Sequence, residues 1–252
     1  MRIVLARWLT VAVFCLIPVA ARADDASDLV AKNLAARGGA DKLAAITSLQ
    51  FTGKLIVPGN YELSYKETRS RKHGATLIQS TIQGLTLVQG YDGNVGWRIN
   101  PFEGRRDAER MSADETGALA DDATIDGALL SAKAQGSAVS YLGREDFEGT
   151  NAYKLRVVLP SGAQYMYYLD PDTYLEIKVV ETRLIRGARQ VTQTSFGDYE
   201  RVGGVYFPFD IESGPPDSVP AQHQKVIISA AKANVDAPDA MFAMPPAPSA
   251  TK

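Results

Sequence analysis

The chain has few of the residues that most often carry chemistry. Its 252 residues include one cysteine, Cys15, and two histidines, His73 and His223. Zinc and copper sites need several imidazole or thiolate ligands at close spacing, and neither histidine has such a neighbour in sequence. We therefore expect no metal site, and we expect both histidines on the surfaces of turns or strands.

Motifs for nucleophiles and nucleotides are also missing. The sequence has no G-x-S-x-G elbow, no P-loop and no dinucleotide-binding fingerprint. Its closest carboxylate pairs are Asp170-Pro171-Asp172, which is typical of a turn, and Asp121-Asp122, which we expect to cap or precede a helix around Ile125. We predict no catalytic residues and no cofactor, with a carboxylate hydrolase as the enzymatic alternative.

The first 23 residues predict a secretory signal. Arg2 and Arg7 precede an apolar stretch, Leu9–Ala20, and cleavage is expected after Ala23. A retained anchor is the alternative, but a membrane span needs roughly 20 apolar residues. Cleavage would remove Cys15, so the exported domain would have no disulfide. At the other end, proline-rich residues 244–252 are expected to form a disordered tail.

The charge balance gives no reason to expect nucleic acid as a partner. The formal net charge is −2, and it becomes −5 when cleavage removes Arg2, Arg7 and Arg22. No broad basic balance therefore attracts the protein to nucleic acid or to anionic lipid.

Alternating apolar residues separated by turn signals predict a meandering antiparallel sheet. The pattern is most regular between Tyr153 and Ile211, and similar strands run from Phe51 to Ile99. We expect an α+β fold of about ten or eleven strands, curled into an incomplete β-barrel, in residues 24–243. A short helix is predicted at Asp25–Ala36.

A helical insertion is predicted between Ser112 and Gly136. Ser112 followed by Glu115 is a candidate capping box. Apolar residues then follow at helical rather than strand spacing, and we expect them to cover the concave side of the sheet as a lid. These candidate ligand-binding residues are Leu119, Ile125, Leu129 and Leu130.

Some strands carry apolar residues on both faces, so both sides of the sheet are expected to be covered. Simple packing by the helices is one interpretation, and an apolar pocket is the other. The candidate lining residues of that pocket are Tyr165, Tyr167, Ile177 and Val179.

The stretch from Tyr91 to Arg110 is rich in unusual residues. One interpretation is a hairpin with a buried tryptophan and a solvated basic loop. The other places Trp97 and Phe102 at the rim of a cavity, where arginine forks could contact an anionic headgroup or a partner. The candidate contact residues are Arg98, Arg105 and Arg106.

Several segments resemble LolA-type outer-membrane lipoprotein-sorting proteins. They are GGADKL at 38–43, YDGNVGWRINPF at 91–102, YLDPDTYL at 168–175, GDYERVGGVYFP at 197–208 and MF at 241–242. The resemblance implies an incomplete β-barrel with a helical lid over a hydrophobic cavity. It extends to the LolB and RseB proteins of the same superfamily. The predicted mature chain does not begin with the lipid-bearing cysteine of LolB, which favours a soluble form.

The resemblance implies a periplasmic carrier of lipoprotein acyl chains or of another lipid, with no enzymatic step. An inner-membrane exporter and an outer-membrane acceptor would be its partners, and we expect a monomer. The alternative is a regulatory module similar to RseB, in which bound lipid alters a protein partner.

Overall fold

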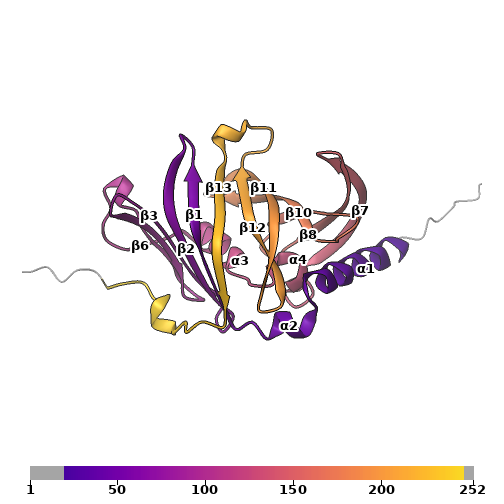
Figure 1. The fold of residues 1–252 in the computed structure, drawn as a ribbon, viewed down its shortest axis with the longest axis horizontal. Helices are drawn as coiled ribbons and strands as arrows, with labels where there is room; N and C mark the ends of the chain where they lie inside the picture. The colour runs from indigo at the N-terminus through magenta and orange to yellow at the C-terminus, as the bar shows by residue number, and fades with distance from the viewer. Residues whose placement is uncertain (1–19, 247–252) are drawn as a thin grey trace, which may run out of the picture.

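Thirteen strands form one antiparallel sheet in the part of the chain that the computed structural model describes, residues 20–246 (Figure 1). They are β1 (Ser48–Val57), β2 (Tyr61–Ser70), β3 (Ala75–Ile82), β4 (Leu85–Tyr91), β5 (Gly96–Ile99), β6 (Glu109–Arg110), β7 (Ala138–Phe147), β8 (Thr150–Val158), β9 (Gln164–Leu169), β10 (Glu176–Ile185), β11 (Ala188–Val202), β12 (Val205–Gly214) and β13 (Gln224–Ala233). The predicted signal lies outside the described residues up to residue 19, and the predicted tail from residue 247 on.

The order of the strands leaves the barrel open. The sheet runs β6-β5-β4-β3-β2-β1-β13-β12-β11-β10-β9-β8-β7, so the first and last strands pair at its centre. The chain moves outward from β1 to one edge, crosses over, and returns from the other edge to β13. The predicted curled antiparallel sheet is confirmed. The expected count of about ten or eleven strands is too low, partly because β6 has two residues and no sequence signal.

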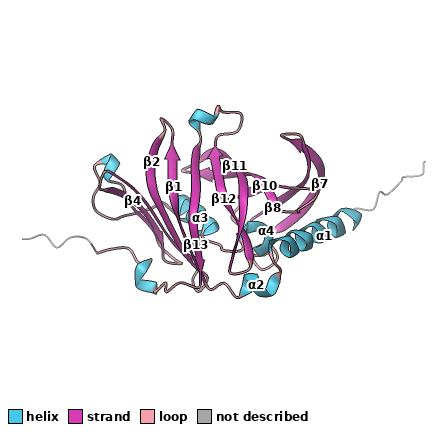
Figure 2. Cartoon of the chain, in the orientation of Figure 1, coloured by secondary structure: helices cyan, strands magenta, loops and turns pink. Residues whose placement is uncertain are grey.

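Helices occupy the crossover and the ends of the sheet (Figure 2). They are α1 (Ala20–Arg37), α2 (Ala40–Ala44), α3 (Ala113–Asp122) and α4 (Gly127–Ser131), with short 3-10 turns η1 (Pro101–Glu103), η2 (Pro220–Gln222) and η3 (Asp239–Met241). Because β6 and β7 lie at opposite edges, the link between them must span the hollow of the sheet. That link contains α3 and α4, and residues 112–132 are called the lid below.

The start of the lid forms as its sequence predicts. The Ser112 hydroxyl accepts from the Glu115 backbone N–H, and the Glu115 carboxylate accepts from the Ser112 N–H, which completes the capping box. The expectation for Asp121-Asp122 is wrong. Both residues lie in the last turn of α3, Ile125 lies between the two helices, and the N-cap of the next helix is Asp126. Acids at this end oppose the helix dipole.

Strand β7 is longer than its apolar pattern, which fades after Leu142. The polar residues that follow stay in the strand because they pair across to β8. Glu145 forms an ion pair with Lys154 at 2.6 Å, and the Arg144 guanidinium lies 4.1 Å from the Tyr153 ring centroid. Cross-strand pairs of this kind stabilise a sheet without help from apolar alternation.

Two buried clusters form the core. The first joins α1 and α4 to β8, β9 and β10, and consists of Ala26, Leu29, Ala128, Leu129, Ala132, Leu155, Val157, Leu159, Ala163, Tyr165, Tyr167, Leu169 and Val179. The second joins α2 and the centre of the sheet, and consists of Leu43, Ile46, Leu49, Phe51, Ile125, Val202, Val205, Phe207, Phe209 and Ile228. Lid residues belong to both clusters, so the lid is part of the core.

In residues 20–246, no helix combines the length and the apolar character that crossing a membrane requires.

A tight contact between β1 and β13 at the centre of the sheet predicts an effect on stability. Gly53 lies at the irregularity where β1 pairs with β13, and a Cβ there would overlap the carbonyl oxygen of Ile227. We predict that Gly53→Ala lowers the free energy of unfolding by about 1–3 kcal/mol, because the backbone of one strand must shift. Urea denaturation measures the change.

Gly117→Ala is the matched control. Gly117 lies inside α3, and nothing lies within 4 Å of a Cβ built there. The same glycine-to-alanine change should raise the free energy of unfolding by about 0.5–1 kcal/mol, since alanine favours a helix interior. Equal effects of the two substitutions would contradict the assignment of the β1–β13 seam as a tight contact.

Candidate ligand-binding site under the lid

The lid and the sheet meet at predicted site residues. Leu129 of α4 is 1 % exposed and lies in the first cluster with Tyr165, Tyr167 and Val179 of the sheet. Tyr167 is the cross-strand partner of both Leu155 and Val179, so these side chains share one face. That face is therefore the one the lid covers.

Of the rest of the predicted lid set, Leu119 and Ile125 are buried and Leu130 is partly buried. Ile125 lies in the second cluster with Phe51 and Phe207, and Leu130 packs against the same cluster. Leu119 of α3 is 7 % exposed. The lid thus inserts apolar side chains at three points along its length, and the apolar part of the covered face is occupied by the protein's own residues.

Three predicted ligand-binding residues lie elsewhere, and one of them, Phe102 of η1, is 49% exposed. Trp97 is 2 % exposed and its Nε1 donates to the carbonyl oxygen of Phe242 at 2.8 Å, so the ring joins β5 to the C-terminal segment. This is the buried tryptophan of the alternative interpretation. Ile177 falls at a register shift between Glu176 and Lys178 and belongs to neither cluster. We assign none of the three side chains to the ligand.

One carboxylate attaches the start of the lid to both arms of the sheet. Glu115 of α3 accepts from Arg186 at 2.9 Å and lies 3.3 Å from Arg98 of β5. Arg186 follows β10 and Arg98 belongs to β5, so the two arginines come from opposite sides of the hollow. Hydrogen bonds from the Ser112 backbone and hydroxyl, and then Arg186, lower the pKa of Glu115 to about 2.

The attachment at the end of α3 is weaker. Asp121 lies 3.5 Å from Arg183 of β10, whose guanidinium also donates to the Tyr165 hydroxyl at 2.6 Å. Burial raises the pKa of Asp121, Arg183 opposes that rise, and the neighbouring Asp122 adds to it. Burial and the helix dipole both disfavour the charged form here, so this contact contributes less than its geometry suggests.

A third attachment holds the turn between α3 and α4. Arg71 donates to both carboxylate oxygens of Asp126, at 2.6 and 2.8 Å, and also to the carbonyl oxygens of Ile46 and Leu43. Arg37 of α1 donates to the Asp126 carbonyl oxygen at 3.1 Å. Bidentate pairing gives this contact a fixed geometry. The lid is therefore held by arginines from α1, from the β2–β3 turn and from both arms of the sheet.

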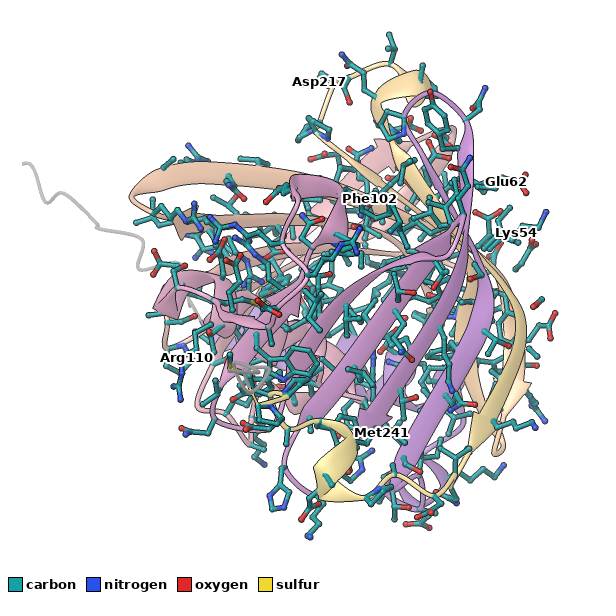
Figure 3. The ribbon with its side chains drawn as sticks, turned by 90° about the vertical axis from the view of Figure 1, so that its left-hand side faces the viewer. Lys54, Glu62, Phe102, Arg110, Asp217 and Met241 are labelled. Carbon is teal, nitrogen blue, oxygen red and sulfur yellow. The ribbon has the colours of Figure 1, made fainter. Side chains whose placement is uncertain are left out.

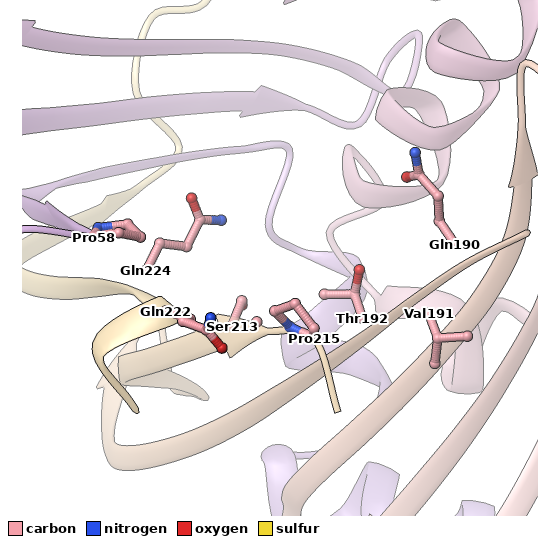
Figure 4. Close-up of a pocket in the computed structure, with 9 residues that line it drawn as sticks. Pro58, Gln190, Val191, Thr192, Ser213, Pro215, Gln222 and Gln224 are labelled. Carbon is pink, nitrogen blue, oxygen red and sulfur yellow. The ribbon is translucent and has the colours of Figure 1, made fainter. Parts of the chain in front are cut away.

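A cavity of about 420 Å³ opens at one end of the sheet (Figure 4). Its lining combines the ends of β11, β12 and β13 with the β1–β2 turn, and consists of Pro58, Gln190, Val191, Thr192, Ser213, Gly214, Pro215, Gln222 and Gln224. No charged side chain belongs to this set. This cavity lies at an uncharged end of the sheet, whereas the apolar face is filled by the lid.

A serine–histidine–glutamate chain lies beside this cavity. His223 Nδ1 is 2.7 Å from Glu212, and His223 Nε2 is 2.9 Å from the Ser218 hydroxyl. The same hydroxyl donates its single proton to the Pro215 carbonyl oxygen at 2.6 Å. A nucleophile must give that proton to its base. This geometry therefore favours a structural role, in which the three side chains hold the β12–β13 loop in place, over nucleophilic chemistry. Residues 20–246 also contain no group of three or more His, Cys, Asp or Glu side chains placed to hold a metal ion.

The arginines that hold the lid were not predicted from the sequence. The lid acids Glu115, Asp121 and Asp126 indicate that cations must face them, since buried carboxylates are paired. Nothing in the chain, however, indicates which of its arginines do so. Arg71 and Arg186 each follow a strand directly, a position that is typical of solvated hairpin ends.

No family model matches the chain, and no protein of curated function matches its sequence. Solved structures match its fold. A DUF1329 family protein from Desulfovibrio piger superposes with a TM-score of 0.59 at 14% identity, covering 87% of this chain and 96% of that chain. A domain from Vibrio parahaemolyticus assigned to outer membrane lipoprotein sorting gives 0.57 at 10% identity, covering 87% and 97%. A LolA superfamily protein from Nitrosomonas europaea gives 0.56 at 12% identity, covering 86% and 97%. The fold is therefore LolA-like, as the resemblance in sequence implies.

The contacts of Glu115 and Asp121 differ in strength, and two substitutions test this ranking. Glu115→Gln removes the charge that meets Arg186 and Arg98, and should lower the free energy of opening of α3 by about 1–2 kcal/mol. Asp121→Asn is the matched control, because Arg183 still contacts Glu181 and the helix end loses an unfavourable charge. It should change that free energy by less than about 0.5 kcal/mol. Hydrogen exchange of amides 116–122 measures both, and a larger loss in Asp121→Asn would contradict the ranking.

The same carboxylate predicts a pH dependence. The pKa of Glu115 is lowered from 4.5 to about 2 in the folded protein, so its contribution is complete above pH 4.5 and is lost as the pH falls through 2. The difference in α3 protection between the wild type and Glu115→Gln should therefore be largest above pH 4.5 and vanish toward pH 2. Glu200→Gln, at an exposed position of β11, should match the wild type throughout. A difference that grows with acidification would contradict this assignment.

Proposed function

We propose that the protein is a periplasmic carrier that buries an acyl chain of a lipoprotein or another lipid beneath its lid. The observation that carries the proposal is the position of Leu129, Tyr165 and Tyr167 in one buried cluster, where the lid occupies the apolar face of a LolA-like sheet. The predicted secretory signal and the solved structure assigned to lipoprotein sorting support the location and the cargo.

Burial of the lid side chains and burial of an acyl chain contribute free energies of similar size. Burying acyl CH₂ groups contributes about 0.8 kcal/mol each, so a long chain gains roughly 10 kcal/mol before ordering costs. The three buried lid side chains Leu119, Ile125 and Leu129 gain together about 4.5–9 kcal/mol from burial, at the usual 1.5–3 kcal/mol each. A lid that competes at this scale lets the cargo enter and also lets it leave.

The contacts of the lid acids with arginines determine which part of the lid opens first. The carboxylate of Asp121 is disfavoured by burial and by the helix dipole, whereas Glu115 and Asp126 each have several donors. The end of α3 is then the place where the lid separates first. An acyl chain entering there would meet Tyr165 and Tyr167 directly. An inner-membrane exporter and an outer-membrane acceptor would be the partners of such a carrier.

A substitution that creates a cavity under the lid tests the proposal. Leu129→Ala removes a fully buried side chain and should lower the free energy of unfolding by about 2–5 kcal/mol. Because it also removes a competitor for the covered face, we predict that it tightens binding of a fluorescent fatty-acid probe about tenfold. Titration of the probe, followed by native mass spectrometry of the complex, gives the affinity and the stoichiometry.

Val205→Ala is the matched control, since Val205 is 0 % exposed but belongs to the second cluster at α2. It should destabilise the protein and leave probe affinity unchanged. A wild type that binds neither fatty acid nor acylated peptide, and that is purified empty from its host, would contradict the proposal. Transfer of bound probe to acceptor vesicles distinguishes a carrier from a sensor, because a sensor should retain its ligand.

A further inference from the structure

The cavity at the end of the sheet lies on the same face that the lid covers farther along. Val179 of the first cluster is the cross-strand partner of Thr194, which is in turn the partner of Ser213 on β12. Because side chains alternate along a strand, Thr192 and Gln190 share the face of Thr194. Gln190 is four residues from Thr194, or roughly 13 Å at about 3.3 Å per residue. The apolar region under the lid and the cavity are therefore two parts of one concave face.

The figures agree with this placement. Figure 4 shows the side chains of Gln190 and Thr192 on one side of β11 and that of Val191 on the other. Figure 3 shows the β12–β13 loop, labelled at Asp217, projecting beyond the ends of the strands. The cavity, which this loop borders through Pro215, is therefore the mouth of the open barrel.

The cavity offers hydrogen bonds without charge. The amides of Gln190, Gln222 and Gln224 each donate and accept, and so do the hydroxyls of Thr192 and Ser213. Ser213 is the cross-strand partner of Gln224, so the hydrogen-bonding set continues from β12 to β13. The three amides are exposed and can exchange water for a ligand. A volume of about 420 Å³ falls in the range of small-molecule sites, roughly 300–1,000 Å³.

The charged side chains next to the cavity give no support to an anionic ligand. Arg183 and Glu181 of β10 are the cross-strand partners of Gln190 and Thr192, and they contact each other. The Arg183 guanidinium also lies 3.5 Å from Asp121 of the lid. Two carboxylates thus share this one cation, so a carboxylate or phosphate that left water here would gain no cation of its own.

The arginines that the sequence suggested for an anionic headgroup do not line this cavity. Arg98 and Arg105 both contact Glu109, at 2.7 and 2.8 Å. Arg106 is exposed on the link between β5 and β6.

We infer that this cavity, the headgroup site of Gln190, Thr192, Ser213, Gln222 and Gln224, binds the uncharged, hydrogen-bonding headgroup of an amphiphile whose acyl chain lies beneath the lid. Glycerol, a sugar and a peptide amide share the required chemistry, since each presents neutral donors and acceptors to amides and hydroxyls. The inference rests on the proposed function, because a chain beneath the lid places its headgroup at the mouth, and it narrows the cargo to nonionic amphiphiles.

Five amphiphiles with the same twelve-carbon chain test the inference on the predicted mature chain. Monolauroylglycerol, dodecyl maltoside and lauroylglycinamide are neutral, laurate is anionic, and dodecyltrimethylammonium is cationic. Each displaces the uncharged fluorophore N-phenyl-1-naphthylamine below its critical micelle concentration, and native mass spectrometry verifies the complexes. The three neutral compounds should bind at least about tenfold more tightly than the two charged ones. Whichever neutral compound binds most tightly supports the inference and identifies the source of the headgroup.

Substitutions in the headgroup site should change this preference. Gln190→Ala/Gln224→Ala should weaken binding of the neutral compounds about tenfold, at roughly threefold for each neutral hydrogen-bonding side chain, and leave laurate unchanged. Gln224→Lys supplies a cation and should strengthen laurate binding up to about fivefold. The matched control is Gln164→Ala/Gln193→Ala, which makes the same change at two glutamines that alternation places on the opposite face of β9 and β11. It should bind all five compounds as the wild type does.

The outcomes separate this inference from the proposed function. Equal affinity for all five compounds, tightest binding of a charged one, or an equal loss in the control would overturn the headgroup site and leave the carrier in place. If none of the five compounds binds, the proposed function falls and the headgroup site falls with it.

Discussion

The packing of Leu129 against the tyrosine face of the sheet is the contact on which the rest of the structure depends. It places the crossover between the two edges of the sheet inside the hollow, and so joins α1, α4 and three strands in one core. An open sheet of this length would otherwise expose an apolar concave face to water, which is unfavourable and invites association. The lid covers that face with apolar side chains of the same chain.

Packing and charge have different roles along the lid. Apolar side chains at Leu119, Ile125 and Leu129 hold it in the sheet without directional preference, whereas the arginine contacts fix where it sits. The bidentate pair of Arg71 with Asp126 anchors one end, and the contacts of Glu115 with Arg186 and Arg98 anchor the other. Between them, Asp121 sits at a helix end that disfavours its charge. A lid with one weak point can open in a defined way while the sheet keeps its shape.

Local signals in the sequence predicted most of the fold, because hairpins and capping boxes depend on neighbouring residues. The Arg186-Gly187 and Gly203-Gly204 turns have positive φ at both positions, as tight hairpins require. The lid set was predicted from helical spacing, and the structure buries Leu119, Ile125 and Leu129 and partly buries Leu130. The position of Trp97 was open in the sequence, since the carbonyl oxygen of Phe242 that holds it lies 145 residues away. The pairing of Arg71 with Asp126 depends likewise on tertiary proximity, which no local pattern encodes.

The central claim is that the lid leaves the sheet when an acyl chain enters. The most direct test is the distance between a spin label at Gly117 on α3 and one at Arg156 on β8, both introduced as cysteines and measured by double electron–electron resonance. Without lipid, the account predicts one narrow distance. With saturating fatty acid, a second and longer distance should appear in proportion to the bound fraction. An unchanged distribution in protein shown by native mass spectrometry to hold the fatty acid would contradict the account.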